Sequence, residues 1–287
     1  MKISRENRVI KKSPHLARKK RRLEIAKKIV VITVAILVIL GSALYWLYRP
    51  EANINKVEVK GTVVLKPSLV EEVVNGEISG KYFYLVPKRS AFFYPKDSIL
   101  RKLEESFKRI EKASVERSGL TGLTVTISER PERYLWCGRA LLLERTPENI
   151  CYFADSGGYV FSRAPFYSGY MFLEFYGPIS AEDVVIPVGK VVLPEDKFNK
   201  VVAFRNGLIP LGFNATKILI KIDGDYELFM AEGGRILLSS KNDLEKSLKY
   251  LNLALGADPL KAKIEKNREM LDYLDLRFGN KVFFRFK

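Results

Sequence analysis

The sequence contains a single histidine and only two cysteines among its 287 residues. His15 lies in a basic N-terminal segment, so the rest of the chain has no imidazole at all. Ser-His-Asp and Cys-His catalytic arrangements require that imidazole, and a zinc site requires several His or Cys ligands at suitable spacing. The scarcity of both residue types therefore excludes these two chemistries from the region that follows the N-terminal segment.

The two cysteines, Cys137 and Cys151, are 14 positions apart and lack the CxxC spacing of metal and redox sites. Two interpretations remain open at this stage. A disulfide can form if this region lies outside the cytoplasm. Two buried free thiols are an equal alternative, because free cysteine packs like a small hydrophobic side chain.

Phosphate-binding and carboxylate signatures are also missing. The "SGGY" and "GGR" segments lack the Lys-Ser/Thr pair of a phosphate-binding loop. The acidic pairs Asp223 with Asp225 and Glu182 with Asp183 stand at predicted strand ends, where Asp and Glu usually form turns. No residue marks a Ser-Lys dyad. We therefore predict a protein that is not an enzyme, with no cofactor and no metal.

Basic charge is concentrated at the N-terminus. Residues 1–28 carry 12 Lys and Arg against two Glu, or +10 of the total net charge of +16. Juxtamembrane basic residues are attracted to anionic inner-leaflet lipid. Nucleic acid is not an expected partner, because the segment has neither interleaved aromatics nor a folded module. We predict a basic cytoplasmic tail over residues 1–28.

The run "IVVITVAILVILGSALYWLY", residues 29–48, contains no charged residue. Its 20 residues match the roughly 30 Å hydrocarbon core of a bilayer, and aromatic residues gather at its end. A cleaved signal peptide and a buried core helix are alternatives; the long basic region before the run and its apolar continuation favour a retained anchor. The positive-inside rule then predicts a single-pass protein of the cytoplasmic membrane, with the C-terminus outside.

Beyond the anchor, residues 53–130 predict one small α+β domain. The order is strand, helix, helix, strand, strand, which builds a three-stranded sheet with two helices on one face. The segments are "NINKVEVKG", "KPSLVEEVVNG", "PKDSILRKLEESFKRI", "KASVERSG" and "LTVTISERPE".

Residues 131–287 predict a β-rich mixed domain with an antiparallel sheet and flanking helices. One helix is expected over residues 195–206, ending at Gly207, and a second begins at Asn242 or Asp243 and turns Leu residues inward. Strands are expected within residues 133–138, 140–162, 170–177 and 217–239 and over the final 281–286, with turns at 155–158, 223–224 and 233–234.

These fragments, in this order, resemble the bacterial cell-division family FtsQ/DivIB over essentially the whole chain. "KVEVKG" resembles the opening of the family's POTRA domain, and "VERSG…LTVTISERPERYLW" resembles its close. "FADSGGYVF", "GGRILLSSKNDLEKSLKYL" and "LDLRF" are similar to motifs of the family's β domain. The chain departs from the family at the Gly119–Gly122 turn and in a bulky aromatic insert around Tyr82–Tyr94.

The resemblance implies a scaffold at the division septum that recruits FtsB/FtsL-type partners, with other divisome membrane proteins contacting the POTRA domain. By position it nominates Arg277, Phe278, Phe284 and Phe286 as partner-binding residues. The alternative function is a membrane-anchored POTRA protein of an export or envelope-assembly system.

The residues themselves favour binding by strand addition at the aromatic C-terminus. Arg277 is expected to offer a two-pronged fork to a partner's carboxylate. Side chains alternate along a strand, so Phe284 and Phe286 share one face and Phe283 lies on the other. Alternation does not say which face is exposed; we predict Phe283 as the core candidate and Phe284 and Phe286 as the outward-facing candidates.

Overall fold

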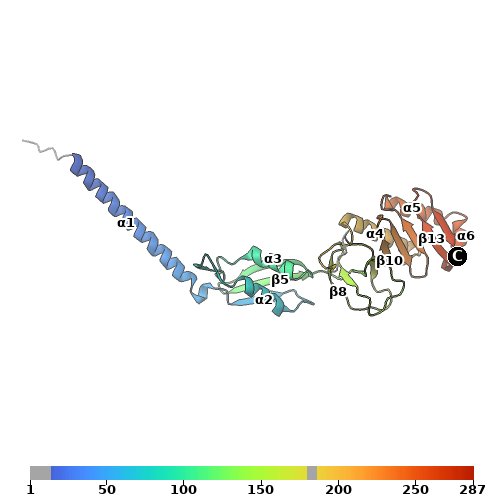
Figure 1. The fold of residues 1–287 in the computed structure, drawn as a ribbon, viewed down its shortest axis with the longest axis horizontal. Helices are drawn as coiled ribbons and strands as arrows, with labels where there is room; N and C mark the ends of the chain where they lie inside the picture. Colours follow the sequence, from blue (N-terminus) through green and yellow to red (C-terminus); the bar gives the residue numbers. More distant parts are fainter. Residues whose placement is uncertain (1–13, 180–185) are drawn as a thin grey trace, which may run out of the picture. The chain divides into compact units, whose positions relative to one another are not determined.

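The computed structural model describes residues 14–179 and 186–287, with side chains from residue 21 onward (Figure 1). Much of the predicted basic tail and the pair Glu182 and Asp183 lie outside the described residues. The described chain forms two compact units. The first comprises the residues up to Leu103 together with Ser114–Thr126, and the second comprises Glu104–Ala113 and Ile127–Lys287. The structure is of the mixed α+β class, as predicted.

The N-terminal helix α1 runs over Pro14–Leu47 and contains the predicted apolar segment. Its part from Arg21 to Leu47 is long and apolar enough to cross a membrane, and none of that apolar stretch is buried within the chain. The helix extends through the basic residues before the apolar run because Lys and Arg are good helix formers. At its far end the Asn53 side chain donates to the carbonyls of Leu47 and Arg49, at 3.0 and 2.6 Å.

Between α1 and residue 129 the elements follow the predicted order of strand, helix, helix, strand, strand. Strand β5 lies between β1 and β4, and it is parallel to β1. The boundary between the two compact units passes through β4 and β5. The elements are a 3-10 turn Pro50–Ala52, β1 Lys56–Lys60, α2 Pro67–Glu77, α3 Lys96–Ser106, β4 Ile110–Ser118 and β5 Gly122–Glu129.

The aromatic insert between the two helices folds into a small hairpin, which was not among the predicted elements. Its strands β2 (Lys81–Tyr82) and β3 (Val86–Pro87) pair antiparallel. The two residues at the tip, Phe83 and Tyr84, have φ of 46° and 63°. Residues other than glycine rarely adopt this left-handed region, and turns of this kind usually contain Asn, Asp or Gly. Because Phe83 and Tyr84 are neither, the sequence carries no turn signal here.

The second unit is built on a nine-stranded sheet in the order β14-β13-β12-β11-β10-β9-β6-β7-β8. The prediction of an antiparallel sheet is wrong in part, because β6 with β9, β9 with β10 and β12 with β13 pair parallel. The strands are β6 Tyr134–Trp136, β7 Tyr152–Ala154, β8 Val160–Arg163, β9 Leu173–Tyr176, β10 Ala215–Ile220, β11 Tyr226–Met230, β12 Arg235–Leu238, β13 Leu271–Asp275 and β14 Phe283–Phe286.

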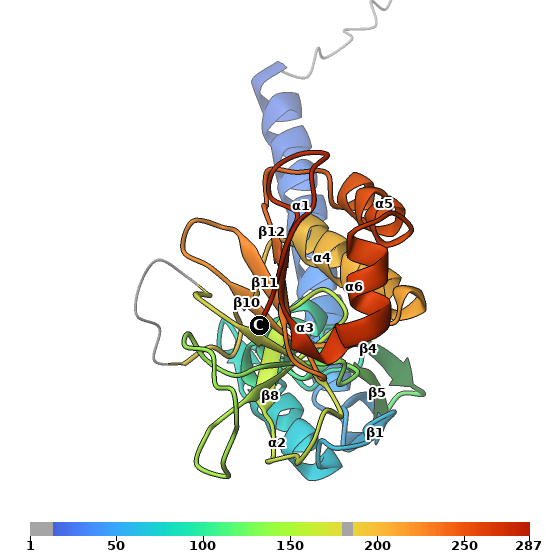
Figure 2. The ribbon, with the colours of Figure 1, turned by 90° about the vertical axis from the view of Figure 1, so that its right-hand side faces the viewer.

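Three helices cover one face of this sheet: α4 (Glu195–Leu208), α5 (Leu244–Leu255) and α6 (Leu260–Asn267) (Figure 2). Short 3-10 turns, Ile209–Leu211 and Arg268–Met270, follow α4 and α6. Of the two predicted cap residues of α5, Asn242 and Asp243, the cap is Asp243, whose side chain accepts from the backbone N–H groups of Glu245 and Lys246.

The prediction that α4 ends at Gly207 is wrong, because the helix continues to Leu208. A Cβ atom at position 207 would lie 2.3 Å from Cδ2 of Leu248 on α5. The glycine therefore serves the close packing of α4 against α5. The chain turns only at Gly212, where φ is +82°.

The strand register places one continuous row of apolar side chains under the helices. Leu274, Ile236, Leu228, Ile218 and Phe175 are cross-strand neighbours from β13 to β9. All five are fully buried in the main core of the unit. Cross-strand neighbours point to the same face of a sheet. This row therefore determines which face every other residue of these strands occupies.

The opposite face is covered at the β6–β9 end by loops. Residues 140–150 contain no strand, contrary to the prediction, and Leu141 and Leu142 instead pack against a second apolar cluster. That cluster includes Phe153, Phe161 and both cysteines, all of them buried.

Gly158 is expected to be essential to the predicted turn at residues 155–158. Its φ is +78°, and an added Cβ would lie 2.7 Å from the ring of the buried Phe198. Gly158→Ala should lower the free energy of unfolding by about 2 kcal/mol or more, because the ring has no room to move and the backbone is strained. Urea denaturation of the chain in detergent measures this.

The neighbouring Gly157 supplies the control. The nearest atom to its added Cβ is 3.6 Å away, which is ordinary contact. Gly157→Ala should change the stability by less than about 0.5 kcal/mol. Equal losses from the two substitutions would contradict this account of the turn.

Candidate partner-binding edge

Strand β14 forms one edge of the nine-stranded sheet. It pairs antiparallel with β13, and within residues 14–179 and 186–287 no strand pairs with its other side. An edge strand presents unpaired backbone N–H and C=O groups, which is a template for adding a strand from another chain. The predicted strand at the C-terminus is confirmed, and its position at the sheet edge suits strand addition.

Phe283 is half exposed, at 50%, so the prediction that it faces the core is wrong. Its ring contacts that of Phe278, which is 58% exposed, in an edge-to-face arrangement with centroids 5.5 Å apart. The register explains the orientation: Phe283 is paired with Asp275, on the face opposite the main core row. The two rings form an exposed aromatic pair beside the free edge.

Phe284 and Phe286 lie on the core side, so the predicted outward orientation is wrong for both. Phe284 pairs with the fully buried Leu274, and both phenylalanines pack against the main core. The Lys263 ammonium of α6 lies over the two rings, 5.4 and 5.8 Å from their centroids. Their assignment as partner-binding residues remains a prediction. The structure gives both rings another role, which is packing against the main core.

Arg277 uses its fork within the chain. Its Nε and Nη2 donate to Oδ1 and Oδ2 of Asp275 at 2.9 and 2.7 Å. Its backbone N–H donates to the same carboxylate at 3.0 Å. The hydrogen bond to Asp275 raises the pKa of the Arg277 guanidinium. Because Asp275 is buried, Arg277 first neutralises that carboxylate, and only its remaining N–H groups are left for a partner.

Two further contacts hold the segment around this edge. The Asn242 side chain donates to the carbonyls of Leu276 and Arg277, at 3.2 and 3.0 Å. Arg285 on β14 is ion-paired with Asp272, and its guanidinium lies 4.9 Å from the centroid of the Tyr273 ring. These contacts hold the edge in place, and an edge that is already ordered suits strand addition because it has less conformational entropy to lose.

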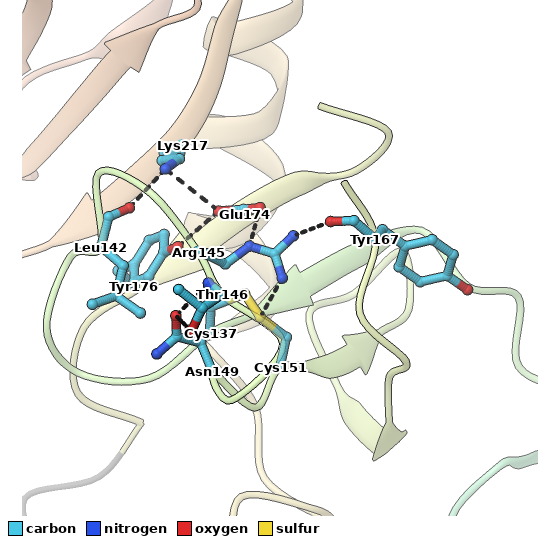
Figure 3. The surroundings of a disulfide bond; sticks show 10 residues. All are labelled: Cys137, Leu142, Arg145, Thr146, Asn149, Cys151, Tyr167, Glu174, Tyr176 and Lys217. Atoms are coloured by element: carbon cyan, nitrogen blue, oxygen red, sulfur yellow. Dashed lines mark hydrogen bonds and ion pairs between the residues drawn. A yellow bond between two sulfur atoms is a disulfide. The ribbon is translucent and has the colours of Figure 1, made fainter. Parts of the chain in front are cut away.

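A buried polar cluster on the opposite face fastens the loop of residues 140–150 to the sheet (Figure 3). Arg145 donates through Nε to Oε1 of Glu174 at 2.6 Å, and Tyr176 donates to Oε2 at 2.7 Å. Lys217 donates to the carbonyl of Leu142 at 2.6 Å and lies 4.0 Å from Glu174. Burial lowers the pKa of Lys217 and raises that of Tyr176.

Cys137 and Cys151 are joined by a disulfide beside this cluster (Figure 3). Both residues are buried, and the Arg145 Nη1 donates to Sγ of Cys151 at 3.2 Å. Of the two interpretations left open by the sequence, the structure has the bonded one. The bond closes the base of the loop whose middle the polar cluster holds.

The acidic pair at residues 223 and 225 forms a turn, as predicted. The Asp223 carboxylate accepts from the backbone N–H of Asp225 at 3.0 Å, and Asp225 accepts from the N–H of Ser240 at 3.3 Å. Among the described residues, no three His, Cys, Asp or Glu side chains gather closely enough to hold a metal ion.

No protein-family model matches this chain, and no curated protein matches its sequence. The resemblance to FtsQ/DivIB therefore stands on the motifs alone.

The polar cluster should behave as a unit. Glu174→Leu leaves Arg145 and Tyr176 buried without their shared acceptor and Lys217 without its counter-charge, and the loss should be about 3–5 kcal/mol in the free energy of unfolding. Replacing Arg145 and Lys217 by Met in the same chain should recover much of that loss, because the uncompensated buried charges are then gone.

The matched control is Glu245→Leu on α5. Glu245 forms an exposed ion pair with Lys249, so its removal should cost less than about 0.5 kcal/mol. A Glu174→Leu variant as stable as the Glu245→Leu variant would contradict the role assigned to the cluster.

The disulfide should contribute about 3 kcal/mol, as expected for a closed loop of this size, here with a sequence separation of 14. The double variant Cys137→Ser, Cys151→Ser should lose this stability, and a reducing agent should lower the stability of the wild-type chain equally. Urea denaturation with and without dithiothreitol tests both. The expectation is refuted if dithiothreitol leaves the stability of the wild-type chain unchanged. It is also refuted if dithiothreitol destabilises the double variant.

Proposed function

We propose that this protein is a single-pass membrane scaffold of the bacterial cell-division machinery that recruits FtsB/FtsL-type partners at the septum by β-strand addition. The observation that carries the proposal is the free edge of β14 with the exposed pair Phe278 and Phe283 beside it. The backbone of the edge supplies hydrogen bonds, and the aromatic pair supplies an apolar anchor for the partner.

The N-terminal region supports the membrane assignment in this proposal. Helix α1 is long and apolar enough to span a bilayer, and the Lys/Arg-rich residues before it favour an N-terminus in the cytoplasm. Anionic inner-leaflet lipid is the proposed partner of the basic segment. A buried disulfide is stable in oxidising surroundings, which agrees with an extracytoplasmic second unit.

The element order of residues 53–130 supports a POTRA-like domain. One strand, two helices and two further strands follow each other there, with the β2–β3 hairpin inserted between the helices. In the proposal, this domain contacts other divisome membrane proteins, and the function is recruitment without catalysis.

The aromatic pair offers a direct test of the binding edge. Phe283→Lys should weaken binding of a synthetic FtsB-type peptide at least tenfold, or about 1.4 kcal/mol, because a charge replaces half of the apolar anchor. The stability of the protein should not change, since Phe283 is half exposed and lies outside the main core. Titration of the purified chain with labelled peptide measures the affinity.

Leu253→Lys is the matched control, because Leu253 is 70% exposed on α5, which covers the face of the sheet opposite to Phe283. It should leave the affinity unchanged. Phe284→Lys is a poor test of binding, since its charge would enter the packing against Leu274 and unfold the edge. Wild-type affinity in Phe283→Lys would eliminate the aromatic pair as the anchor.

The identity of the partner needs a separate experiment. The tagged full-length chain should co-purify with the FtsB/FtsL-type proteins of its own organism, and the Phe283→Lys chain should retain less of them. Retention of export or outer-envelope assembly factors in their place would favour the alternative, a POTRA protein of such a system.

A further inference from the structure

The β2–β3 hairpin is the part of the chain for which the proposed function has no use. Its tip exposes three consecutive apolar or aromatic side chains: Phe83 is 91% exposed, Tyr84 is 94% exposed and Leu85 is 59% exposed. Large apolar side chains that protrude together from a surface mark a contact with a membrane or a partner.

The backbone at this tip is strained in order to present these side chains. Phe83 and Tyr84 are the central residues of a turn closed by the bond from the Leu85 N–H to the Tyr82 carbonyl, at 2.9 Å. Both have positive φ, which turns of this kind usually meet with Asn and Gly. Neither side chain gains packing within the chain in exchange. Backbone strain that is not offset by side-chain packing is typical of a functional contact.

The hairpin is attached directly to the end of the apolar helix. The Tyr48 hydroxyl donates to the carbonyl of Leu85 at 2.7 Å, and the Lys81 ammonium lies 4.9 Å from the centroid of the Tyr48 ring. Tyr48 is the last residue of the uncharged run, where a spanning helix meets the headgroup layer. The tip is thereby held at the level of the bilayer surface.

A second set of bonds fixes the base of the hairpin to the same place. The Ile54 N–H donates to the carbonyl of Arg89 at 2.8 Å, and the Ala91 N–H donates to that of Ala52 at 3.0 Å. The chain leaving the hairpin is therefore paired with the chain leaving α1. Because Asn53 also caps the end of α1, helix end and hairpin form one bonded junction.

The charge around the tip agrees with an anionic lipid surface. No acidic residue lies between Glu77 and Asp97, whereas that stretch contains Lys81, Lys88, Arg89 and Lys96. Basic residues next to an apolar protrusion are attracted to anionic headgroups while the apolar side chains enter the interface.

We infer that the β2–β3 hairpin is a second membrane contact, whose tip inserts Phe83, Tyr84 and Leu85 into the outer leaflet beside the end of α1. The inference rests on the part of the proposed function in which α1 spans the bilayer. The first unit would then contact the bilayer at two points, through α1 and through the hairpin tip. Two points of contact would restrict rotation of this unit about the axis of α1.

The test is a depth measurement on the full-length chain in nanodiscs of phosphatidylcholine and phosphatidylglycerol that hold one chain each. An environment-sensitive fluorophore is attached at Tyr84→Cys, at Ile36→Cys in the middle of α1, or at Ile222→Cys, whose side chain is 97% exposed in the second unit. The two native cysteines are bonded to each other and do not compete for the label.

Lipids with a spin label near the headgroup should quench position 84 several-fold more strongly than position 222, and aqueous iodide should quench position 84 less. Adding Phe83→Ser and Leu85→Ser should bring position 84 to the level of position 222. If position 36 is quenched by deep spin labels while position 84 matches position 222 and is open to iodide, the hairpin inference is overturned and the anchor stands.

If position 36 also escapes quenching, the anchor itself has failed and the inference falls with it. A tip that is buried only against a second copy of this chain would be accessible to iodide in these single-chain nanodiscs, which also counts against the membrane contact.

Discussion

The row of apolar side chains that crosses the nine-stranded sheet is the constraint on which the second unit depends. From Phe175 on β9 to Leu274 on β13, each residue of the row is the cross-strand neighbour of the next, and all are withdrawn from water. Side chains alternate along a strand, so a slip of one residue would expose the whole row. The register is therefore imposed by burial, and burial assigns Phe284 to the core and Phe283 to the surface.

The same register brings charged residues under the loops on the other face. Lys217 precedes the row residue Ile218, and Glu174 precedes Phe175, so both are directed away from the helices and toward the loop of residues 140–150. Burying them is tolerable because Arg145, Tyr176 and the loop carbonyls satisfy their hydrogen bonds. The disulfide then closes the loop. Helices α4–α6 cover one face of the sheet, and on the other face a loop held by polar contacts and a disulfide covers it.

In the proposed function, strand addition requires an open strand edge whose surroundings are held in place. The edge at β14 meets both needs: its inner side is paired with β13, and Asn242, Asp272 and Asp275 hold the side chains and turn around it. Nearer the N-terminus, Tyr48 donates to the hairpin and Asn53 donates to the end of α1, so these two segments are also held in place. In the proposed function, both ends of the protein are thereby oriented before any partner or lipid is engaged.

Several elements could be predicted from the sequence alone: the apolar helix, the three strands and two helices of residues 53–130, the start of α5 at residue 242 or 243, and the strand at the C-terminus. These follow from hydrophobic run length, periodicity and capping chemistry, which are local. The faces of β14, the pairing of Arg277 with Asp275, the continuation of α4 through Gly207 and the hairpin at residues 81–87 became visible only in the folded chain. Alternation along a strand gives two faces without saying which is buried. Arg277 folds back onto Asp275, two residues away, because the neighbouring strands β12 and β14 bury that carboxylate, and the neighbour of Gly207 comes from another helix, so packing decides both.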